Sequence, residues 1–341
     1  MEIHALTGAS MAGGRTFLTR REFLAAGVGV ALAASRARAQ PAPRVPRIGI
    51  LNFGPPPQAG APPEPIQRYL AELGYRSGTT VAYEVRYAIG DRDAYPRLAH
   101  ELLQRDLDVL FLPGSDIGPT LAEQKPSIPV VFAISDDPVA GGVVPSLARP
   151  GGRVTGVTHM SPELAGKRLE ILKEAVPELQ RVAVLHDPTT IVQYYGQLEL
   201  ASGGAGVRLV PAPYRSTADF APAFASARRA GAQAIFVEPN RYTLGYAKEV
   251  AALAISHRIP AISAYDAFVR GDGLLSYGAT ANDIIGRAAA QVDKILRGTP
   301  PGDIPVEQPV RFALVVNNRA AGAMSLTLPQ SLLLRADEVI R

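Results

Sequence analysis

The stretch IPVVFAISDDPVAGGVVPSLARPGGRVTGVT, residues 128–158, decides how this chain folds. It begins with an apolar run from Val130 to Ile134, which is typical of a strand that is covered on both faces of a parallel sheet. Ser135 and Asp136 follow this run directly. Because open α/β sheets place their ligands at the carboxyl ends of the strands, both residues are candidate ligand contacts.

The pair Asp137-Pro138 allows a structural explanation for the acidic residues. A carboxylate followed by Pro at the first helical position is a common helix start, so Asp137 and also Asp136 can cap backbone N–H groups. Both roles stay open for these residues. Val154 to Thr158 predicts a second short strand, and Gly156 to Ser161 is a candidate hinge where the chain leaves one unit for another.

Apolar runs and amphipathic segments alternate along the rest of the chain. Residues 47–51, 108–112, 181–185 and 234–237 predict buried strands, with helices between them and Gly- or Pro-rich junctions. This order favours parallel sheets with right-handed crossovers. Since the pattern occurs on both sides of residues 156–161, we expect two α/β units that face each other across a ligand cleft.

Composition narrows the classes of protein to consider. The chain has 341 residues, of which 47% are apolar, and this is enough for two domains of ordinary size. It contains no cysteine, which excludes disulfides, thiolate metal sites, thiol nucleophiles and a lipid on an N-terminal cysteine.

The first 39 residues are typical of an export signal. Thr19-Arg20-Arg21-Glu22-Phe23-Leu24 resembles a twin-arginine signal, the apolar run 25–34 is too short for a membrane anchor, and Ala37-Arg38-Ala39 offers a cleavage site. We therefore expect residues 1–39 to be removed and the protein to reside in the periplasm. This segment holds five Arg and two acidic residues, which leaves 30 basic and 29 acidic residues in the remainder. A nucleic-acid partner is not expected for such a balanced charge.

The usual motifs of catalysis and cofactor binding are missing from the sequence. The turn after the first strand lacks G-x-G-x-x-G, and no P-loop or G-x-S-x-G turn occurs. The histidines beyond residue 39 are scattered singly without metal-ligand spacing; they are His100, His159, His186 and His257. We expect no cofactor, no metal site and no enzymatic activity.

Polar and aromatic residues at the strand ends of both units favour a binding function. The first unit supplies Asn52, Phe53, Ser115, Asp116, Ser135 and Asp136; the second supplies Asp187, Glu238, Asn240 and Tyr265; Thr158 and Tyr277 lie where the chain crosses. A carboxylate in a dry cleft needs a cation, so Asp136, Asp187 or Glu238 is expected to receive an ammonium group.

Some of these candidates also have structural explanations. Ser115 or Asp116 can cap a helix that is predicted from about residue 117 to residue 124. Phe53, Tyr265 and Tyr277 can stack on a flat ligand or pack in the core or hinge. The sequence leaves both explanations open.

The segment IPVVF…DPV…SLARPGGRVTG within residues 128–158 resembles the family of ABC-transporter substrate-binding proteins that includes tryptophan- and tyrosine-binding receptors. Residues 271–277 and the tail 305–340 are similar to the same family, and the resemblance extends over about residues 47–341. Two departures are Arg153, where the family pattern has Asn, and the Pro-rich run 55–65 at the ligand mouth.

The resemblance implies a two-lobed α/β fold of the periplasmic-binding-protein type I class, with a parallel sheet in each lobe and a cleft and hinge between them. Lobe 1 would comprise residues 40–157 and about 273–305, and lobe 2 residues 158–272 and about 306–341. The implied function is capture of a small organic solute, an amino acid with aromatic ones favoured, by a monomer that closes its lobes. The protein would deliver this solute to an ABC permease and its ATPase; the alternative is a periplasmic ligand sensor.

Overall fold

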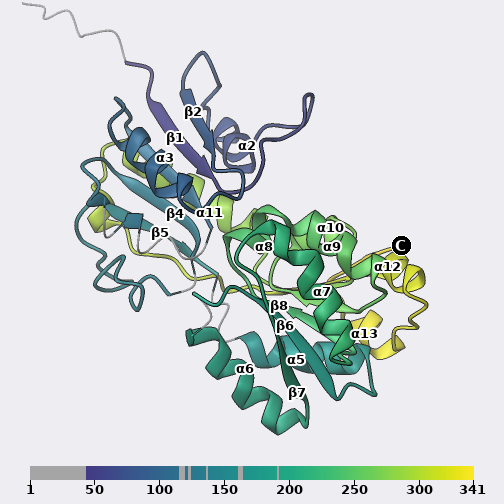
Figure 1. Cartoon of the computed structure of the whole chain (residues 1–341). Helices are drawn as coiled ribbons and strands as arrows, with labels where there is room; N and C mark the ends of the chain where they lie inside the picture. The colour runs from purple at the N-terminus through teal and green to yellow at the C-terminus, as the bar shows by residue number, and fades with distance from the viewer. Residues whose placement is uncertain (1–43, 115–119, 122–123, 136, 160–163, 190–191) are drawn as a thin grey trace, which may run out of the picture. The chain divides into compact units, whose positions relative to one another are not determined.

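Two β-sheets organise the unit from Val45 to Arg341 (Figure 1). The computed structural model describes residues 44–114, 120–121, 124–135, 137–159, 164–189 and 192–341. Each sheet contains mainly parallel strands, and the chain alternates strands with helices that pack on the sheet faces. This is the expected α/β architecture.

The first sheet has five parallel strands in the order β2-β1-β3-β4-β5. They are β1 (Arg47–Asn52), β2 (Ala82–Tyr87), β3 (Val109–Pro113), β4 (Val130–Ser135) and β5 (Val154–Thr158). Successive residues of β1 point to opposite faces, as in any strand. Ile48 and Ile50 share a core with α2 (Pro65–Glu72) and α11 (Ala281–Leu296), whereas Leu51 belongs to the core that includes Leu102 of α3. Helix α3 spans Ala94–Leu103.

The second sheet has seven strands in the order β12-β11-β10-β9-β8-β6-β7. They are β6 (Arg181–His186), β7 (Arg208–Pro213), β8 (Ala234–Val237), β9 (Ala261–Ser263), β10 (Leu275–Gly278), β11 (Ala313–Asn317) and β12 (Glu338–Ile340). All neighbours run parallel except β10 and β11, which are antiparallel. The mainly parallel sheet expected for this lobe is confirmed, and β10 and β11 are its one antiparallel pair among the described residues.

Helices around the second sheet include a long one that the sequence did not indicate. They are α5 (Ala165–Ala175), α6 (Val192–Ala205), α7 (Phe220–Arg229), α8 (Arg241–Gly245), α9 (Ala247–Ser256), α10 (Asp266–Arg270), α12 (Asn318–Ala323) and α13 (Gln330–Arg335). Helix α6 packs against α5 and β7. Its sequence, VQYYGQLELASGGA, mixes small and polar residues without a clear apolar stripe, so periodicity did not predict it.

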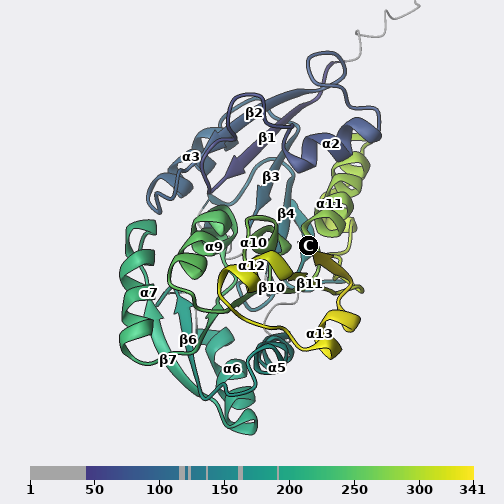
Figure 2. The same cartoon turned by 90° about the vertical axis from the view of Figure 1, so that its right-hand side faces the viewer.

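The chain returns from the second sheet to the first and back again near its C-terminal end. Helix α11 packs on β4 and β5 and lies beside α2, while the strands before and after it, β10 and β11, belong to the second sheet (Figure 2). The expected start of the return at about residue 273 was wrong, because β10 hydrogen-bonds within the second sheet as far as Gly278.

Two of the crossing segments are paired side by side. Val157 forms a parallel β-bridge with Glu307, and the N–H of Thr158 donates to the carbonyl of Glu307 over 2.9 Å. Gly156 is held tightly, since a Cβ added there would lie 2.2 Å from the carbonyl oxygen of Phe132. The described part of the hinge candidate, residues 156–159, therefore begins as a sheet strand; residues 160–161 lie outside the description.

Candidate functional site

Each sheet has a point where the chain connections change direction, and the candidate site lies between these two points. In the first sheet, β1 pairs with β2 on one side and with β3 on the other. In the second, β6 pairs with β7 and β8 in the same way. Open α/β sheets bind ligands outside the carboxyl ends of such strands. The residues at these ends include Asn52, Pro113, Asp187 and Glu238.

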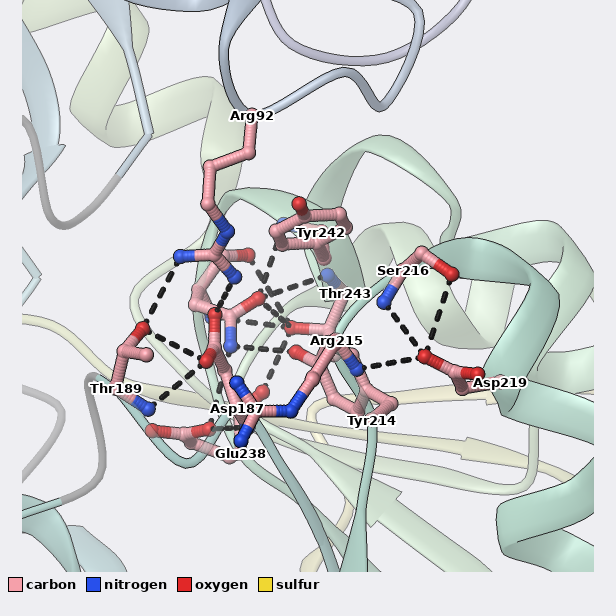
Figure 3. A network of polar contacts seen from close by, with 11 residues as sticks. Arg92, Asp187, Thr189, Tyr214, Arg215, Ser216, Asp219, Glu238, Tyr242 and Thr243 are labelled. Carbon is pink, nitrogen blue, oxygen red and sulfur yellow. Dashed lines mark hydrogen bonds and ion pairs between the residues drawn. The ribbon is translucent and has the colours of Figure 1, made fainter.

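An ion pair joins the loops of the two sheets. The guanidinium of Arg92, after β2, hydrogen-bonds to the carboxylate of Asp187, after β6, and also donates to the hydroxyl of Thr189 over 3.1 Å (Figure 3). The side chain of Asp187 is only 1% exposed. Burial lowers the pKa of Arg92, but its hydrogen bond to Asp187 and the charge of that carboxylate outweigh this effect, so the pKa lies above its ordinary value.

A buried polar network supports Asp187 from the second sheet. The N–H of Asp187 donates to Oε2 of Glu238 over 2.8 Å, and Nδ2 of Asn240 donates to the same oxygen over 3.2 Å. Asn240 also donates to the hydroxyl of Tyr214 over 2.6 Å and caps α8 by accepting from the N–H groups of Tyr242 and Thr243. Asp187 and Glu238 are thus both bonded to protein groups.

Aromatic and cationic side chains form a second contact between the sheets. The ring of Phe53, directly after β1, meets the ring of Tyr242 of α8 edge-on at 4.4 Å. The guanidinium carbon of Arg241 lies 4.9 Å from the centre of the Phe53 ring and 4.8 Å from that of Tyr95. These cation–π contacts hold the plane of the Arg241 side chain, which is 8% exposed.

A cavity of about 170 Å³ lies beside these contacts. Its walls come from both sheets: Asn52, Phe53, Gly54, Pro55, Glu64, Tyr87 and Pro113 from the first, and Arg241, Leu244 and Gly245 from the second. At one edge the backbones of Gly54 and Gly245 touch, since a Cβ added to Gly54 would lie 2.8 Å from the carbonyl oxygen of Gly245.

The polar groups of the first-lobe wall are bonded to one another. The hydroxyl of Tyr87 donates to Oε1 of Glu64 over 2.8 Å, and Nδ2 of Asn52 donates to the same oxygen over 3.2 Å. Burial, followed by the hydrogen bond to Glu64, raises the pKa of Tyr87 to about 12. The phenol is therefore neutral and able to donate at any physiological pH.

Comparison with known proteins identifies the family. Residues 57–340 match the family model for the ABC transporter substrate binding protein. The chain belongs to this family. A curated relative, the tyrosine-binding protein of Clostridioides difficile, is 20% identical over 283 residues, which are 82% of this chain and 81% of the relative.

Solved structures show that this substrate-binding protein has the two-lobed type I fold. A conserved domain protein from Vibrio cholerae has a TM-score of 0.77 at 24% identity, and the match covers 87% of this chain and 100% of that one. An ABC domain from Streptococcus pneumoniae in complex with L-Trp has a TM-score of 0.74 at 24% identity, with the same coverage.

The described ligand-contact residues that the sequence predicted for this substrate-binding protein lie in three places. Asn52 and Phe53 line the cavity, and Asp187 and Glu238 lie in the ion-pair network beside it. Thr158, Tyr265 and Tyr277 lie at the crossings. Ser115, Asp116 and Asp136 lie outside the described residues, and Ser135 ends β4 with a side chain that is not described.

The residues at the crossings pack tightly. The ring of Tyr265 stacks on that of His159 at 5.4 Å, and Tyr277 packs near Phe312 at 6.5 Å. Fully buried Arg168 donates to the carbonyl of Tyr277 over 2.7 Å. Asp137 accepts from the N–H groups of Val139 and Ala140, so it caps a turn, and the described residues 138–153 that follow contain no helix.

Sequence reasoning missed several residues of the site: Glu64, Tyr87, Arg92, Arg168 and Arg241. Arg241 follows the predicted strand 234–237 by a few residues, which is the signal that identified the other candidates, and Arg92 follows β2 in the same way. Glu64 lies at the end of the Pro-rich run 55–65, where the sequence indicated only a ligand entrance that departs from the family pattern.

Metal and membrane sites were sought among the described residues alone. There, no cluster of His, Asp and Glu side chains has the arrangement to hold a metal ion. None of the helices in the same part of the chain is sufficiently long and apolar to span a bilayer.

Proposed function

We propose that this protein is the solute-binding component of an ABC import system, which captures a small organic solute between its lobes and delivers it to a membrane permease and its ATPase. The observation that carries this proposal is the cavity with walls from both sheets. A solute that fills it contacts both lobes at once, so binding favours the closed arrangement over an open one.

An amino acid is the favoured solute, with aromatic side chains preferred. The L-Trp complex and the tyrosine-binding relative among the similar proteins support this class. Phe53 and Tyr87 provide aromatic surface in the cavity. The signal-like residues 1–39 support export to the periplasm, where the protein would act as a monomer.

Thermal unfolding with a panel of solutes tests the binding function. A ligand that binds the native state alone must raise the transition temperature as its concentration increases. We expect aromatic amino acids to raise it and neutral sugars to leave it unchanged. A rise with sugars alone would contradict the amino-acid assignment and leave solute binding in place.

Uptake measurements separate an importer from a sensor. If the protein supplies a permease, deletion of its gene abolishes high-affinity uptake of the labelled solute, and expression from a plasmid restores it. Unchanged uptake in the deletion strain would overturn the import proposal.

A further inference from the structure

We propose that the cavity recognises a zwitterionic solute: the carboxylate of Glu64 binds the ammonium group of the solute, and the guanidinium of Arg241 binds its carboxylate. This inference rests on the proposed function, because it assigns the solute class to the same site between the lobes. It differs from the sequence-based expectation, which gave the ammonium group to Asp136, Asp187 or Glu238.

The two described acids of that expectation are bonded to residues that do not line the cavity. Asp187 forms the ion pair with Arg92 and accepts from the N–H and hydroxyl of Thr189. Glu238 accepts from the N–H of Asp187 and from Asn240. Neither lines the cavity, whereas Glu64 does. Glu64 is thus the acid that a solute in this cavity meets.

Glu64 is fixed in place before any solute arrives. Tyr87 and Asn52 both donate to Oε1, and the N–H of Glu64 donates to the side-chain oxygen of Gln67 over 3.1 Å. The Pro-rich run brings Glu64 to this position by delaying the start of α2 to Pro65. A carboxylate held in this way loses little conformational entropy when it binds a cation.

Arg241 provides the opposite charge from the other lobe. Its guanidinium is held over Phe53 and Tyr95, and a planar fork of N–H donors matches the geometry of a carboxylate. Pro55, Pro113 and Leu244 add apolar surface to the same cavity. In such surroundings a solute with both charges is favoured over one that lacks either.

Because the charges belong to different lobes, the solute itself would connect them. Its ammonium group contacts the first lobe and its carboxylate the second, so both contacts form together only in the closed arrangement. The touching backbones of Gly54 and Gly245 at the cavity edge fix how closely the two walls approach. Recognition and closure would then depend on the same pair of charges.

Isothermal titration calorimetry with matched ligands tests the assignment of each charge. The first ligands are L-tryptophan, indole-3-propionate, which lacks the ammonium group, and tryptamine, which lacks the carboxylate. The other common L-amino acids and their deaminated and decarboxylated analogues follow. We expect the wild-type protein to bind one amino acid at least about ten-fold more tightly than either of its analogues.

Two variants separate the two contacts. Glu64→Gln keeps an oxygen acceptor for Tyr87 and Asn52 but removes the negative charge, so we expect affinity for the amino acid to fall about 10- to 100-fold and affinity for the deaminated analogue to stay unchanged. Arg241→Gln should weaken binding of the amino acid and spare that of the amine. Glu72→Gln, at the exposed end of α2, is the control and should bind as the wild type does.

The outcomes distinguish this inference from the proposed function. Equal losses for the amino acid and its deaminated analogue in Glu64→Gln, or no loss for either, would overturn the zwitterion assignment while the protein remained a solute receptor. Binding of sugars but of no amino acid would do the same. Failure of the wild-type protein to bind any solute would remove the proposed function and this inference with it.

Discussion

The guanidinium of Arg92 and the carboxylate of Asp187 form an ion pair that connects the loop after β2 in the first lobe to the loop after β6 in the second. Asp187 is almost completely buried, whereas the side chain of Arg92 is 34% exposed. Tyr242 of the second lobe also lies under Arg92, with its ring centre 5.2 Å from the guanidinium carbon. The arginine thus contacts the opposite lobe through a charge and through an aromatic face.

Removal of this arginine should weaken solute binding without unfolding either lobe. In Arg92→Ala the buried carboxylate of Asp187 loses its cation in the closed arrangement, so closure becomes less favourable. We expect the solute affinity to fall about ten-fold, which corresponds to ~1.4 kcal/mol. Isothermal titration calorimetry measures this loss.

The control for this variant removes an arginine that pairs within one lobe. Arg335 of α13 pairs with Glu174 of α5, both around the second sheet. Arg335→Ala should leave the affinity unchanged. Equal affinities for Arg92→Ala and the wild type would show that the ion pair does not contribute to closure.

The contact between Gly54 and Gly245 leads to a second prediction. A Cβ at position 245 would lie 2.9 Å from the Cα of Gly54, and backbone atoms cannot move aside as a flexible side chain can. Gly245→Ala should therefore hold the lobes apart, lower the solute affinity and give a larger radius of gyration at saturating solute than the wild type. Small-angle scattering measures the radius.

A glycine with open surroundings provides the matched comparison. Gly322 lies in α12, and outside its chain neighbours and the backbone of its own helix no atom lies within 4 Å of an added Cβ. Gly322→Ala should bind the solute normally and close normally. If Gly245→Ala scatters like this control, the observed approach of the two backbones is not needed for closure.

The sequence predicted those parts of the fold whose physical signal lies within a short segment of the chain. The apolar run at 130–134 lies in β4, because strands buried on both faces need continuous apolar sequence. The strand expected at 154–158 is β5. Helix α6 carries no such local signal, and the apolar run of β11 gives no indication of strand direction. Residues 313–317 are as apolar as a parallel strand, and only the path of the chain after α11 reverses their direction.

The sequence predicted those residues of the candidate site that lie at strand ends. Asn52 ends β1, and Asp187 and Glu238 directly follow β6 and β8. The preference of ligands for the carboxyl ends of strands in open sheets therefore identified them. Their partners were not predictable in this way. Arg92 meets Asp187 only because the two lobes bring together loops that are 95 positions apart in the chain. Local patterns contain no information about such a contact.

Titration of the tyrosines gives a third prediction, on pH. The pKa values of Tyr75, Tyr83 and Tyr87 are each raised from 10.0 to about 12, in every case mainly by burial. Since the folded state favours the neutral phenol, this part of the stability is complete below pH 10 and is lost as the pH rises from 10 to about 12. The melting temperature should fall over that interval.

Tyrosinate absorbance assigns part of this effect to one residue. Tyr87→Phe should remove one of the late-titrating phenols from the alkaline absorbance curve of the folded protein. If all tyrosines titrate together near pH 10 while circular dichroism still shows the native fold, burial does not protect them and the prediction is wrong.

Arg168 leads to the last prediction, on stability. Its side chain is fully buried, and its guanidinium connects α5 to the carbonyl of Tyr277 at 2.7 Å and to the hydroxyl of Tyr194 of α6 at 2.6 Å. Arg168→Met fills a similar space but cannot donate, so it leaves buried polar groups without this partner. We expect the free energy of unfolding, measured with urea, to fall by about 3 kcal/mol. Arg319→Met, which changes an exposed side chain, should leave it unchanged; similar values for both variants would mean that the buried hydrogen bonds of Arg168 contribute little to the fold.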